Sequence, residues 1–448
     1  MENQLLAVKA LVLVETRGMP IPEAVERTCR DRPIDVRRSV QAFVYETIKR
    51  RNLLDELVAA GSDAHPEDVR SPYVRQILRV GTLEMKIWRN PPPAVTDCMV
   101  RIAKRLVGSK AGAFVNAVLR GVERVSVKDV LEDRPWTERL ALKYGHPEWF
   151  VLYVLDLFEG DRSRVELLLR ANNRVPPQYL RINRLKLDPL VAGDVLEREY
   201  GIVTEPTFLE EVRALVRGRG YGSRAWREGL FDVQDLASAS ASAALSAEPG
   251  ETVLDVCAAP GSKTTHTAER MLDEGEVWAV DRSEWGLRVL ERRCRRLGIT
   301  CVRTICRDAR GLTVDDLPDV PDRILVDPPC STTGVWNRNP DSRWKPKPLE
   351  RFAERQWEIL EPALRIAEEH GCTLVYSTCS VSWEENEAIV KRALEEFDVK
   401  LVDAGVLGSP GIEEFRGERF SGYKKVRRYW PFRHDTAGFF VAKMKGKG

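Results

Sequence analysis

Three short stretches of this sequence hold the residues that could do chemistry. They are VLDVCAAPGSKTTHTAE (253–269), DPPCSTTG (327–334) and YSTCSVSWEENE (376–387), and each begins in or follows an apolar, strand-like run. The first combines an acid with a Gly/Pro turn, as cofactor loops do. The other two each place a cysteine where a strand ends, at Cys330 and Cys379. Because a thiolate is a strong nucleophile, these stretches together predict a cofactor-dependent reaction that uses a thiol.

The first stretch predicts a site for a nucleoside. Asp255 ends a strand, and Gly261 allows close approach of the backbone in the turn that follows. Asp281 ends the next strand, twenty residues after Gly261. A carboxylate at that distance suits the two hydroxyls of a ribose, and Asp308 could accept a hydrogen bond from an adenine amino group. Taken singly, each aspartate could equally be a helix N-cap or a turn residue.

The turn lacks the glycines of a dinucleotide site. Residues 257–263 contain a single glycine, so they offer no cradle for a pyrophosphate, and a nucleoside without phosphates fits better. S-adenosylmethionine is therefore the predicted cofactor. Its predicted site comprises Cys257, Ala258, Ala259, Pro260, Gly261, Ser262, Lys263, Asp281, Asp308 and Asp327.

Strand-like and helical segments alternate from about residue 248 onward. Apolar runs rich in Val, Ile and Leu predict strands, and the stretches between them predict helices, such as 284–297 and 349–370. Buried strands that alternate with helices form a mostly parallel sheet covered on both faces. In such sheets ligands bind beyond the carboxyl ends of the strands, where the three stretches lie. The strands are predicted at 252–256, 276–281, 323–327 and 373–377.

The preceding residues divide into two further regions. Residues 1–130 show helical spacing of apolar residues without strand alternation, which predicts a small all-α domain. Residues 131–245 mix helical and strand-like pieces and are predicted to be a linking α+β subdomain. Residues 246–448 then form the catalytic domain. The first 135 residues hold 23 Lys and Arg against 18 Asp and Glu, a net charge of +5. Their basic residues are either a solvated helix face or a contact with RNA phosphates.

Composition excludes several classes of protein. No run reaches the roughly 18 apolar residues of a membrane span, and the start of the chain lacks the features of a signal peptide. A cytoplasmic protein is expected. The nine cysteines form no CxxC pair, and Cys294, Cys301 and Cys306 lack zinc spacing and nearby histidines. We therefore expect neither a disulfide framework nor a metal site.

At this point the sequence resembles the Sun-type RNA cytosine-C5 methyltransferases. The resemblance rests on CAAPGSKT, the acid at Asp281, DPPC, and STCS followed by ENE, and it covers roughly residues 140–448. It extends to LRINRLK (180–186), FDVQDLAS (231–238) and the final HDTAGFFVAKM (434–444). Near the start, GAFVNAVLRGV (112–122) resembles the NusB-like RNA-binding domain of the bacterial ribosomal-RNA members.

The resemblance implies a fold. The catalytic domain is expected to be an α/β, Rossmann-like S-adenosylmethionine methyltransferase core with a mixed, mostly parallel sheet. An all-α NusB-like domain precedes it, joined by the small α+β subdomain. The implied partner is RNA, with ribosomal RNA first and transfer RNA second, and the chain is expected to be a monomer. The alternative is a non-catalytic RNA-binding or assembly factor that keeps the fold.

The chemistry explains why two thiols are needed. Carbon-5 of cytosine is a poor nucleophile until a thiolate adds to carbon-6. The spacing of the residues leaves open which thiol attacks, since both lie at neighbouring strand ends, and DNA enzymes use the cysteine that corresponds to Cys330. The RNA family implies Cys379 as the nucleophile and Cys330 as the residue that helps release the product. Asp327 is expected to hold the cytosine edge, and Lys263 to supply positive charge near the base.

Two further features concern the RNA and the loop. The family usually has Gly-Gly before the lysine, whereas this chain has Ser262, which would cost about 1 kcal/mol if that position needs a positive φ. The target base must leave the stack, because carbon-6 is unreachable in a helix. The segment 333–347, with Trp336, Trp344 and several cations, is predicted to bind single-stranded RNA, or else to be a loop with anchoring tryptophans. The segment 424–435 has the same character.

Overall fold

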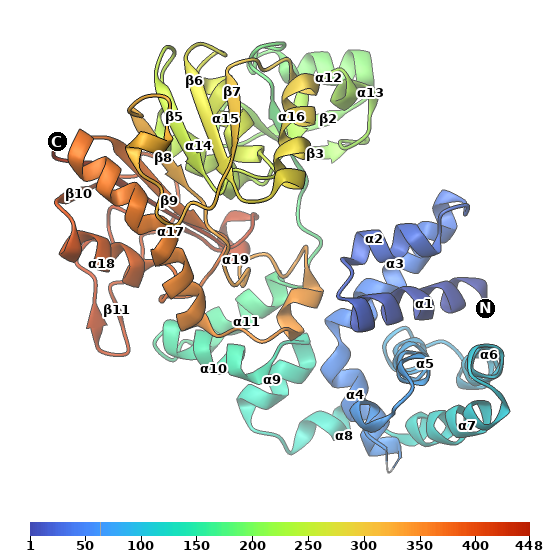
Figure 1. The fold of residues 1–448 in the computed structure, drawn as a ribbon. Coiled ribbons are helices and arrows are strands. Elements are labelled where there is room, and N and C mark those ends of the chain that lie inside the picture. The colour runs from blue at the N-terminus through green and yellow to red at the C-terminus, as the bar shows by residue number, and fades with distance from the viewer. Residues whose placement is uncertain (63) are drawn as a thin grey trace. The chain divides into compact units, whose positions relative to one another are not determined.

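The computed structural model describes residues 1–62 and 64–448. The chain forms two compact units (Figure 1). Unit 1 comprises residues 1–173 together with 338–346, and unit 2 comprises residues 174–337 and 347–448. Helices α9 to α11 thus group with the N-terminal helices, although the sequence places them in the linking subdomain. The three-part division remains a prediction alongside these two units.

Unit 1 is helical, as predicted for the N-terminal region. The helical spacing buries one face of each helix, as Val40, Val44 and Ile48 show in α3. Helices α4 and α7 pack so closely that a Cβ on Gly121 would lie 1.7 Å from the carbonyl oxygen of Gly61. The helices are α1 (Glu2–Arg17), α2 (Ile21–Thr28), α3 (Ile34–Lys49), α4 (Arg51–Gly61), α5 (Pro72–Thr82), α6 (Pro92–Leu106), α7 (Ser109–Arg124), α8 (Val127–Glu132), α9 (Trp136–Tyr144), α10 (Glu148–Leu157) and α11 (Arg162–Ala171), with short turns η1 (Pro66–Asp68), η2 (Leu83–Ile87) and η4 (Pro340–Trp344).

The prediction of an RNA-binding loop at 333–347 is wrong for its main residues. Trp336 has none of its surface exposed, and Arg343 is equally buried. The Arg343 guanidinium donates to the carbonyl oxygen of Gly145 at 2.6 Å, and the Trp344 indole donates to the carbonyl oxygen of Ile48 at 2.7 Å, all within unit 1. These side chains anchor the segment instead of presenting stacking surfaces to a base.

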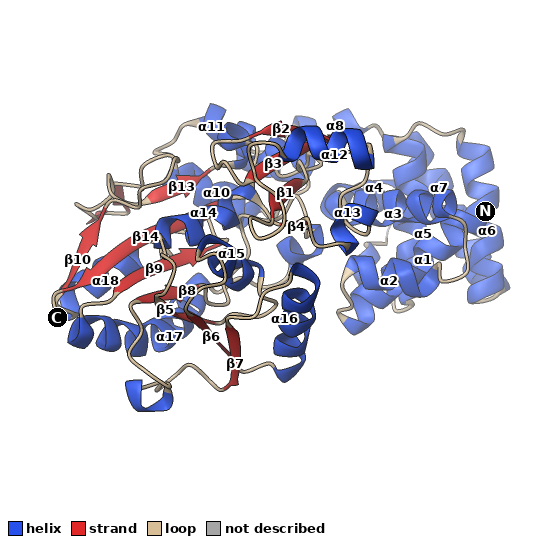
Figure 2. Cartoon of the chain, turned by 90° about the horizontal axis from the view of Figure 1, so that it is seen from above, coloured by secondary structure: helices blue, strands red, loops and turns tan. Residues whose placement is uncertain are grey.

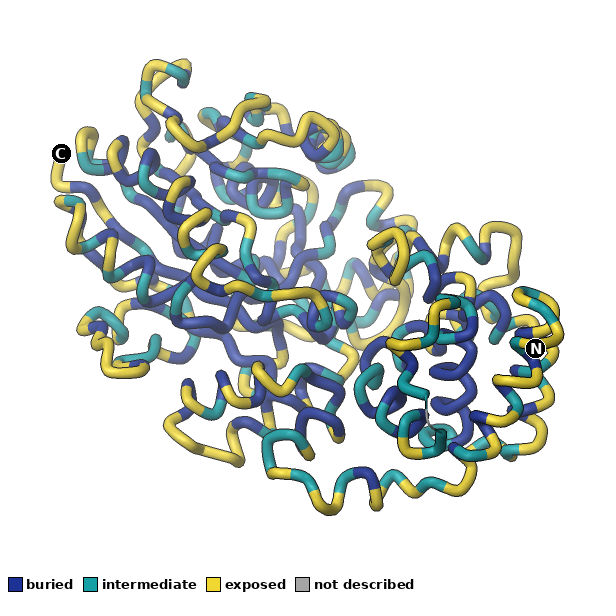
Figure 3. Tube along the Cα trace, turned by 60° about the horizontal axis from the view of Figure 1, so that its bottom comes forward, coloured by how far each residue is buried: buried dark blue, intermediate teal, exposed yellow. Residues whose placement is uncertain are grey.

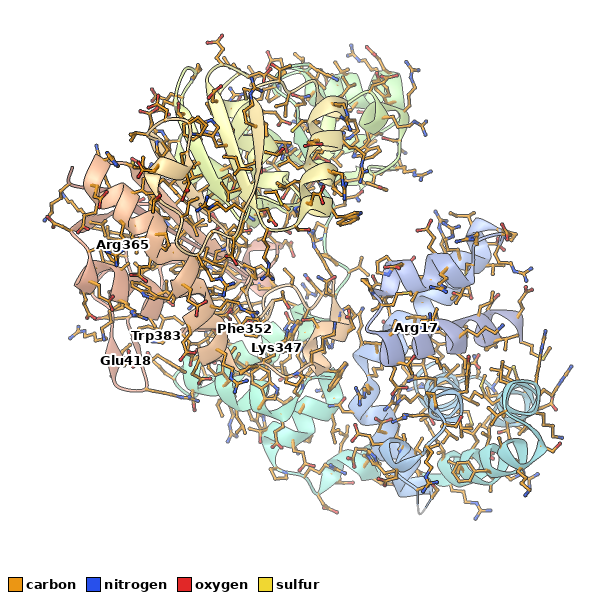
Figure 4. The ribbon with its side chains drawn as sticks, viewed as in Figure 1. Arg17, Lys347, Phe352, Arg365, Trp383 and Glu418 are labelled. Carbon is orange, nitrogen blue, oxygen red and sulfur yellow. The ribbon has the colours of Figure 1, made fainter. Side chains whose placement is uncertain are left out.

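The end of this loop and part of the segment 424–435 also contact other residues of the protein. Lys347 Nζ lies 5.9 Å from the centre of the Phe352 ring (Figure 4). In the later segment Tyr429 and Trp430 are buried, and buried Arg428 forms an ion pair with Glu387. Mixed aromatic and basic composition therefore marks packing here, and the prediction of an RNA surface at 424–435 is wrong for these three residues.

Unit 2 begins with a four-stranded antiparallel sheet in the order β2-β3-β1-β4. Its apolar core includes Leu180, Ile182 and Phe231, which are fully buried. The strands are β1 (Tyr179–Ile182), β2 (Val203–Pro206), β3 (Val212–Arg217) and β4 (Phe231–Val233), accompanied by α12 (Ala192–Tyr200) and α13 (Arg224–Arg227). This small sheet confirms the α+β character predicted between the helical region and the catalytic core.

The second sheet of unit 2 has the order β10-β14-β9-β8-β5-β6-β7, with β13 paired to β14. Strands β5 to β9 are parallel, whereas β14 runs antiparallel between β9 and β10. The predicted mixed, mostly parallel sheet is confirmed. Its strands are β5 (Thr252–Val256), β6 (Glu276–Asp281), β7 (Val302–Cys306), β8 (Arg323–Val326), β9 (Thr373–Thr378), β10 (Val399–Val402), β13 (Arg427–Tyr429) and β14 (Phe439–Gly446); β11 (Glu414–Phe415) and β12 (Glu418–Arg419) pair separately.

Helices cover both faces of this sheet (Figure 2). Helix α14 lies on one face and α17 on the other, and both contact β8, β9 and β14. The strands between them are almost wholly buried (Figure 3), which explains their continuous apolar sequences. The helices are α14 (Leu236–Leu245), α15 (Ser262–Arg270), α16 (Glu284–Leu297), α17 (Leu349–His370), α18 (Glu387–Glu396) and α19 (Pro431–His434), with the turn η3 (Val314–Asp316).

The sheet topology locates a binding site. Strand β5 lies at the centre, with β6 next to it on one side and β8 on the other, so the strand order reverses there. Ligands of such sheets bind in the crevice at the carboxyl ends of these strands. Among the described residues, no helix is both long and apolar enough to cross a membrane.

Candidate active site

Two cysteine sulfurs lie side by side at the edge of the large sheet. Cys330 follows β8 and Cys379 follows β9, and their Sγ atoms are 3.1 Å apart. Both thiols are free and only partly buried. Because β8 and β9 are parallel neighbours, their carboxyl ends meet at one edge, as the sequence predicted. The arrangement gives one reacting atom access to two thiols.

A lysine and a carboxylate accompany the thiols. Lys263 Nζ donates to Asp327 Oδ2 at 2.5 Å, and Ser377 Oγ donates to Asp327 Oδ1 at 2.8 Å. Burial alone would lower the pKa of Lys263, but Asp327 and the nearby Cys379 raise it above its ordinary value. The lysine is therefore a fixed cation near Cys379.

A cavity of about 360 Å³ opens beside the two thiols. This volume falls in the range of about 300–1,000 Å³ typical of small-molecule sites. Both cysteines line it, together with five residues of the predicted cofactor site: Cys257, Ala259, Asp281, Asp308 and Asp327. The other five predicted residues, Ala258, Pro260, Gly261, Ser262 and Lys263, do not line it and instead build the turn and the start of α15.

The turn before α15 depends on one glycine. Gly261 is the N-cap of α15 at φ 94°, and a Cβ there would lie 2.2 Å from Leu290 Cδ1. Ser262 is the first residue of α15 and has no positive φ, so the expected strain from serine at this position is absent. The Ala259 N–H donates to Asp281 Oδ2 at 3.1 Å, which ties the turn to the end of β6.

We expect Gly261→Ala to lower the affinity for S-adenosylmethionine at least tenfold. An alanine at positive φ costs about 1 kcal/mol, and its methyl group would push on the buried Leu290, so the turn must shift. Calorimetric titration of the cofactor measures the change. Gly250→Ala is the matched control, because Gly250 has a φ of +87° and open space around it. Equal affinities for both variants and wild type would contradict this role of Gly261.

The acidic groups in the cavity wall differ in their surroundings from the buried Asp255, which does not line the cavity. Burial raises the pKa of Asp255 to about 7, although the Thr264 hydroxyl donates to it at 2.6 Å. Burial, with Asp281 next, raises the pKa of Cys257 to about 12, which makes this thiol a poor nucleophile. Hydrogen bonds from Arg310 lower the pKa of Asp308 to about 2, with a shortest contact of 2.6 Å. Asp308 is therefore an anion that already has a partner.

A buried arginine of the small sheet supports the cofactor turn. Arg181 in β1 donates to both carboxylate oxygens of Glu269 at 2.8 Å and to the carbonyl oxygen of Ser262 at 2.6 Å. Both members of the ion pair are fully buried. Removing either would leave an uncompensated buried charge, so the pair fixes the start of α15. The LRINRLK motif thus has a structural basis that its sequence did not reveal.

Sequence reasoning missed several residues of the site. Arg282, Arg307 and Arg310 line the cavity, and each is adjacent or close in sequence to a predicted aspartate. Their position beside those aspartates could have identified them. Arg355 also lines the cavity, but it lies in the middle of α17 and carries no sequence signal. In the described part of the chain, no cluster of three or more His, Cys, Asp or Glu residues could hold a metal ion.

The fold and the cavity define a class of protein. The mixed sheet has a nucleoside-sized cavity where its strand order reverses, and an acid at the end of β6 suits a ribose. This is the architecture of a Rossmann-like S-adenosylmethionine methyltransferase. Residues 242–445 match the family of 16S rRNA methyltransferases RsmB/F, and residues 1–124 match the NusB family.

Curated relatives agree along most of the chain. The probable ribosomal RNA small subunit methyltransferase B of Bacillus subtilis is 32% identical over 415 residues, covering 91% of this chain and 90% of the relative. The ribosomal RNA small subunit methyltransferase B of Vibrio cholerae is 34% identical over 350 residues, covering 76% and 77%. The chain belongs to the RsmB/F family of RNA cytosine-5 methyltransferases.

Solved structures show the same architecture. PH0851 matches with a TM-score of 0.81 and 26% identity, covering 99% of this chain and 98% of that one. A methyltransferase homologue from Pyrococcus horikoshii matches with a TM-score of 0.62 and 30% identity, covering 70% and 99%. The predicted family, cofactor and reaction are confirmed: the protein methylates carbon-5 of cytosine in RNA with S-adenosylmethionine.

Proposed function

We propose that Cys379 is the nucleophile of this reaction and that Cys330 assists product release, with small-subunit ribosomal RNA as the substrate. The observation that carries the assignment is the 3.1 Å separation of the two sulfurs beside a cavity that Asp327 also lines. Lys263 distinguishes the two thiols, because its positive charge interacts electrostatically with Cys379. The choice of Cys379 over Cys330 also follows the family resemblance.

The cavity residues fit S-adenosylmethionine. We expect Asp281 to accept from the ribose hydroxyls and Asp308 from the adenine amino group, since both line the cavity together with Cys257 and Ala259. Asp281 keeps accepting capacity after its bonds from the Ala259 and Ser283 N–H groups, because a carboxylate offers about four lone pairs. When bound, the cofactor supplies an electrophilic methyl group.

The thiol then explains how carbon-5 becomes reactive. The Cys379 thiolate adds to carbon-6 of cytosine, forming an S–C bond while the C5=C6 double bond moves its electrons toward carbon-5 and the pyrimidine carbonyl. Carbon-5 accepts the methyl group. Loss of the carbon-5 proton, assisted by Cys330, and cleavage of the S–C6 bond restore the double bond and the thiolate. Asp327 holds the cytosine edge throughout, and Lys263 supplies positive charge near the base.

We propose that the helical region of unit 1 binds RNA phosphates through a basic patch at the end of α6 and the start of α7. The patch comprises Lys104, Arg105 and Lys110, all exposed. Two other predicted cations are already engaged: Lys49 is buried and donates to the carbonyl oxygen of Asn173. Arg51 is paired with Glu67 at 2.8 Å.

Replacing Lys104, Arg105 and Lys110 together with glutamine should weaken RNA binding and flatten its salt dependence. Each lost phosphate contact lowers the magnitude of the slope of log K against log salt by about 0.7 to 0.9, so the slope of the triple variant should be smaller by about 2 to 3. Fluorescence anisotropy at several salt concentrations measures the slope. A triple variant at the exposed Lys9, Arg17 and Arg27 is the matched control. An unchanged slope in the patch variant would remove this patch from the RNA interface.

Bisulfite mapping of 5-methylcytosine in total RNA, with and without the protein, tests the substrate. We expect one or more cytosines of small-subunit ribosomal RNA to lose modification when the protein is absent. Loss confined to transfer RNA would favour that second candidate. No change in any RNA would favour a non-catalytic binding or assembly factor. A cytoplasmic location and a monomeric state complete the proposal, and sedimentation of the purified chain tests the latter.

A further inference from the structure

One buried carboxylate connects the loops of both cysteines. Glu385 has no exposed surface, and both of its oxygens accept hydrogen bonds. Oε1 accepts from the Ser331 backbone N–H at 2.7 Å and from Gln356 Nε2 at 2.8 Å. Oε2 accepts from the hydroxyls of Ser331, Ser380 and Ser382 at 2.5, 2.5 and 2.8 Å. All of these donors are neutral, so among the described residues the charge has hydrogen bonds but no cation as partner.

Two donors of Glu385 are sequence neighbours of the two cysteines. Ser331 directly follows Cys330, and Ser380 directly follows Cys379. A single side chain thus holds both loops at the point where each cysteine leaves its strand. The neighbouring Asn386 adds to this, since its Nδ2 donates to the carbonyl oxygen of Ser380 at 3.1 Å. Glu385, which lies 54 residues after Ser331 in the sequence, therefore holds the loops that carry the two sulfurs.

The charges around the two thiols are opposite in sign. The negative charge of the buried Glu385 raises the pKa of Cys330. The positive charge of Lys263 instead interacts with Cys379. The hydrogen bond with Cys379 is the largest cause that raises the pKa of Cys330, followed by burial, the charge of Cys379 and that of Glu385. The titratable groups that surround Cys330 are Cys379, Glu385, Tyr376, Asp327, Arg355 and Lys263.

We propose that Glu385 is the positioning residue of this site: it fixes the separation of the two sulfurs, and its negative charge opposes a second negative charge on Cys330. The inference rests on the roles proposed above for the two thiols. It assigns to Glu385, the first residue of the ENE motif, a function other than binding the cofactor or the RNA. Glu385 does not line the cavity, so it acts only through the cysteine loops.

The test is the Glu385→Gln variant of the full chain. Glutamine keeps the shape, can still accept from the Ser331 N–H and Gln356, and can donate toward the serine hydroxyls, so mainly the charge is lost. Alkylation of each cysteine by iodoacetamide is followed by mass spectrometry across pH, without RNA. We expect Cys330 to react several-fold faster at pH 8 than in wild type, because the Glu385 charge is one of the causes that raise the pKa of Cys330 and its removal favours the reactive thiolate. Single-turnover methyl transfer should fall about tenfold or more, with cofactor affinity within twofold of wild type.

Two variants complete the experiment. Glu395→Gln removes the same charge from an exposed position of α18 and should leave both measurements unchanged. Ser380→Ala releases the Cys379 loop from Glu385 but keeps the charge, so turnover should fall several-fold with little change in the alkylation profile of Cys330. If Glu385→Gln proves unfolded by its melting curve, a Ser380→Ala variant with wild-type turnover overturns the positioning role.

The outcomes separate this inference from the proposed catalytic roles. An alkylation profile of Cys330 that is identical in wild type and a folded Glu385→Gln variant overturns the proposed effect of the Glu385 charge on Cys330. Unchanged turnover in that variant overturns the positioning role. If instead the alkylation shift occurs but Cys379→Ala keeps its activity, the role of Glu385 in thiol ionisation stands and the proposed nucleophile is wrong.

Discussion

Replacing Cys379 with alanine is expected to reduce methyl transfer to RNA at least about 10³-fold. Without the thiolate, no covalent bond forms at carbon-6, and carbon-5 keeps the low nucleophilicity of an aromatic ring carbon. The remaining site can still bind the cofactor, because the cavity wall formed by Cys257, Ala259 and Asp281 is untouched. Transfer of a labelled methyl group measures the loss, and calorimetry should show cofactor affinity close to wild type.

The matched control is Cys372→Ala. Cys372 lies immediately before the same strand, β9, but its thiol is buried and donates to the carbonyl oxygen of Pro321 at 2.9 Å. The control should lose only stability, by about 1 to 2 kcal/mol for a small cavity, and keep its turnover. If Cys379→Ala stays active while Cys330→Ala is inactive, the order of the two thiols is that of the DNA enzymes and the assignment is reversed.

The sheet and the position of the thiols could be predicted because they depend on local sequence. Runs such as 252–256 and 276–281 became β5 and β6 with the predicted bounds, and the predicted helix 349–370 became α17. Short apolar runs rich in Val, Ile and Leu that alternate with helices are typical of buried strands. Once the strands are parallel neighbours, the residues that follow them must meet at one edge, so Cys330 and Cys379 could be placed together from the sequence.

The network behind the thiols could not be predicted in the same way. Glu385 reaches Ser331 across 54 residues, and the sequence around it reads as a polar turn before α18. Arg181 reaches Glu269 across 88 residues from another sheet. Which buried carboxylate meets which donor depends on the tertiary arrangement, and the pattern of hydrophobicity contains no information about it.

Composition gave a wrong answer in the segment 333–347. Tryptophan and arginine are suited both to stacking on bases and to anchoring a loop, since both combine a large apolar surface with a donor. The structure shows the second use, because Trp336 is fully buried and the Arg343 guanidinium donates hydrogen bonds to backbone carbonyl oxygens. Burial also lowers the pKa of Arg343 to about 9, and the positive charge of Arg50 contributes in the same direction.

Replacing Cys330 with alanine is expected to trap the enzyme on its RNA. In this variant Cys379 can still attack carbon-6 and carbon-5 can still accept the methyl group, but the group that assists loss of the carbon-5 proton is missing. The S–C6 bond cannot break until that proton leaves, so the covalent complex accumulates. A protein–RNA band that resists denaturant on a gel detects the complex, and labelled cofactor shows that the trapped base already carries the methyl group.

The trapping experiment also tests the geometry. Because the sulfurs are only 3.1 Å apart, the Cys330 thiol lies within reach of the base that Cys379 holds. Among the described residues, the one other thiol that lines the cavity is that of Cys257. Burial raises the pKa of Cys257 to about 12, so it should not replace Cys330. The double variant Cys330→Ala/Cys379→Ala must give no adduct, since the bond to RNA is made by Cys379. An adduct in the double variant, or none in Cys330→Ala alone, would show that the two thiols do not divide the reaction in this way.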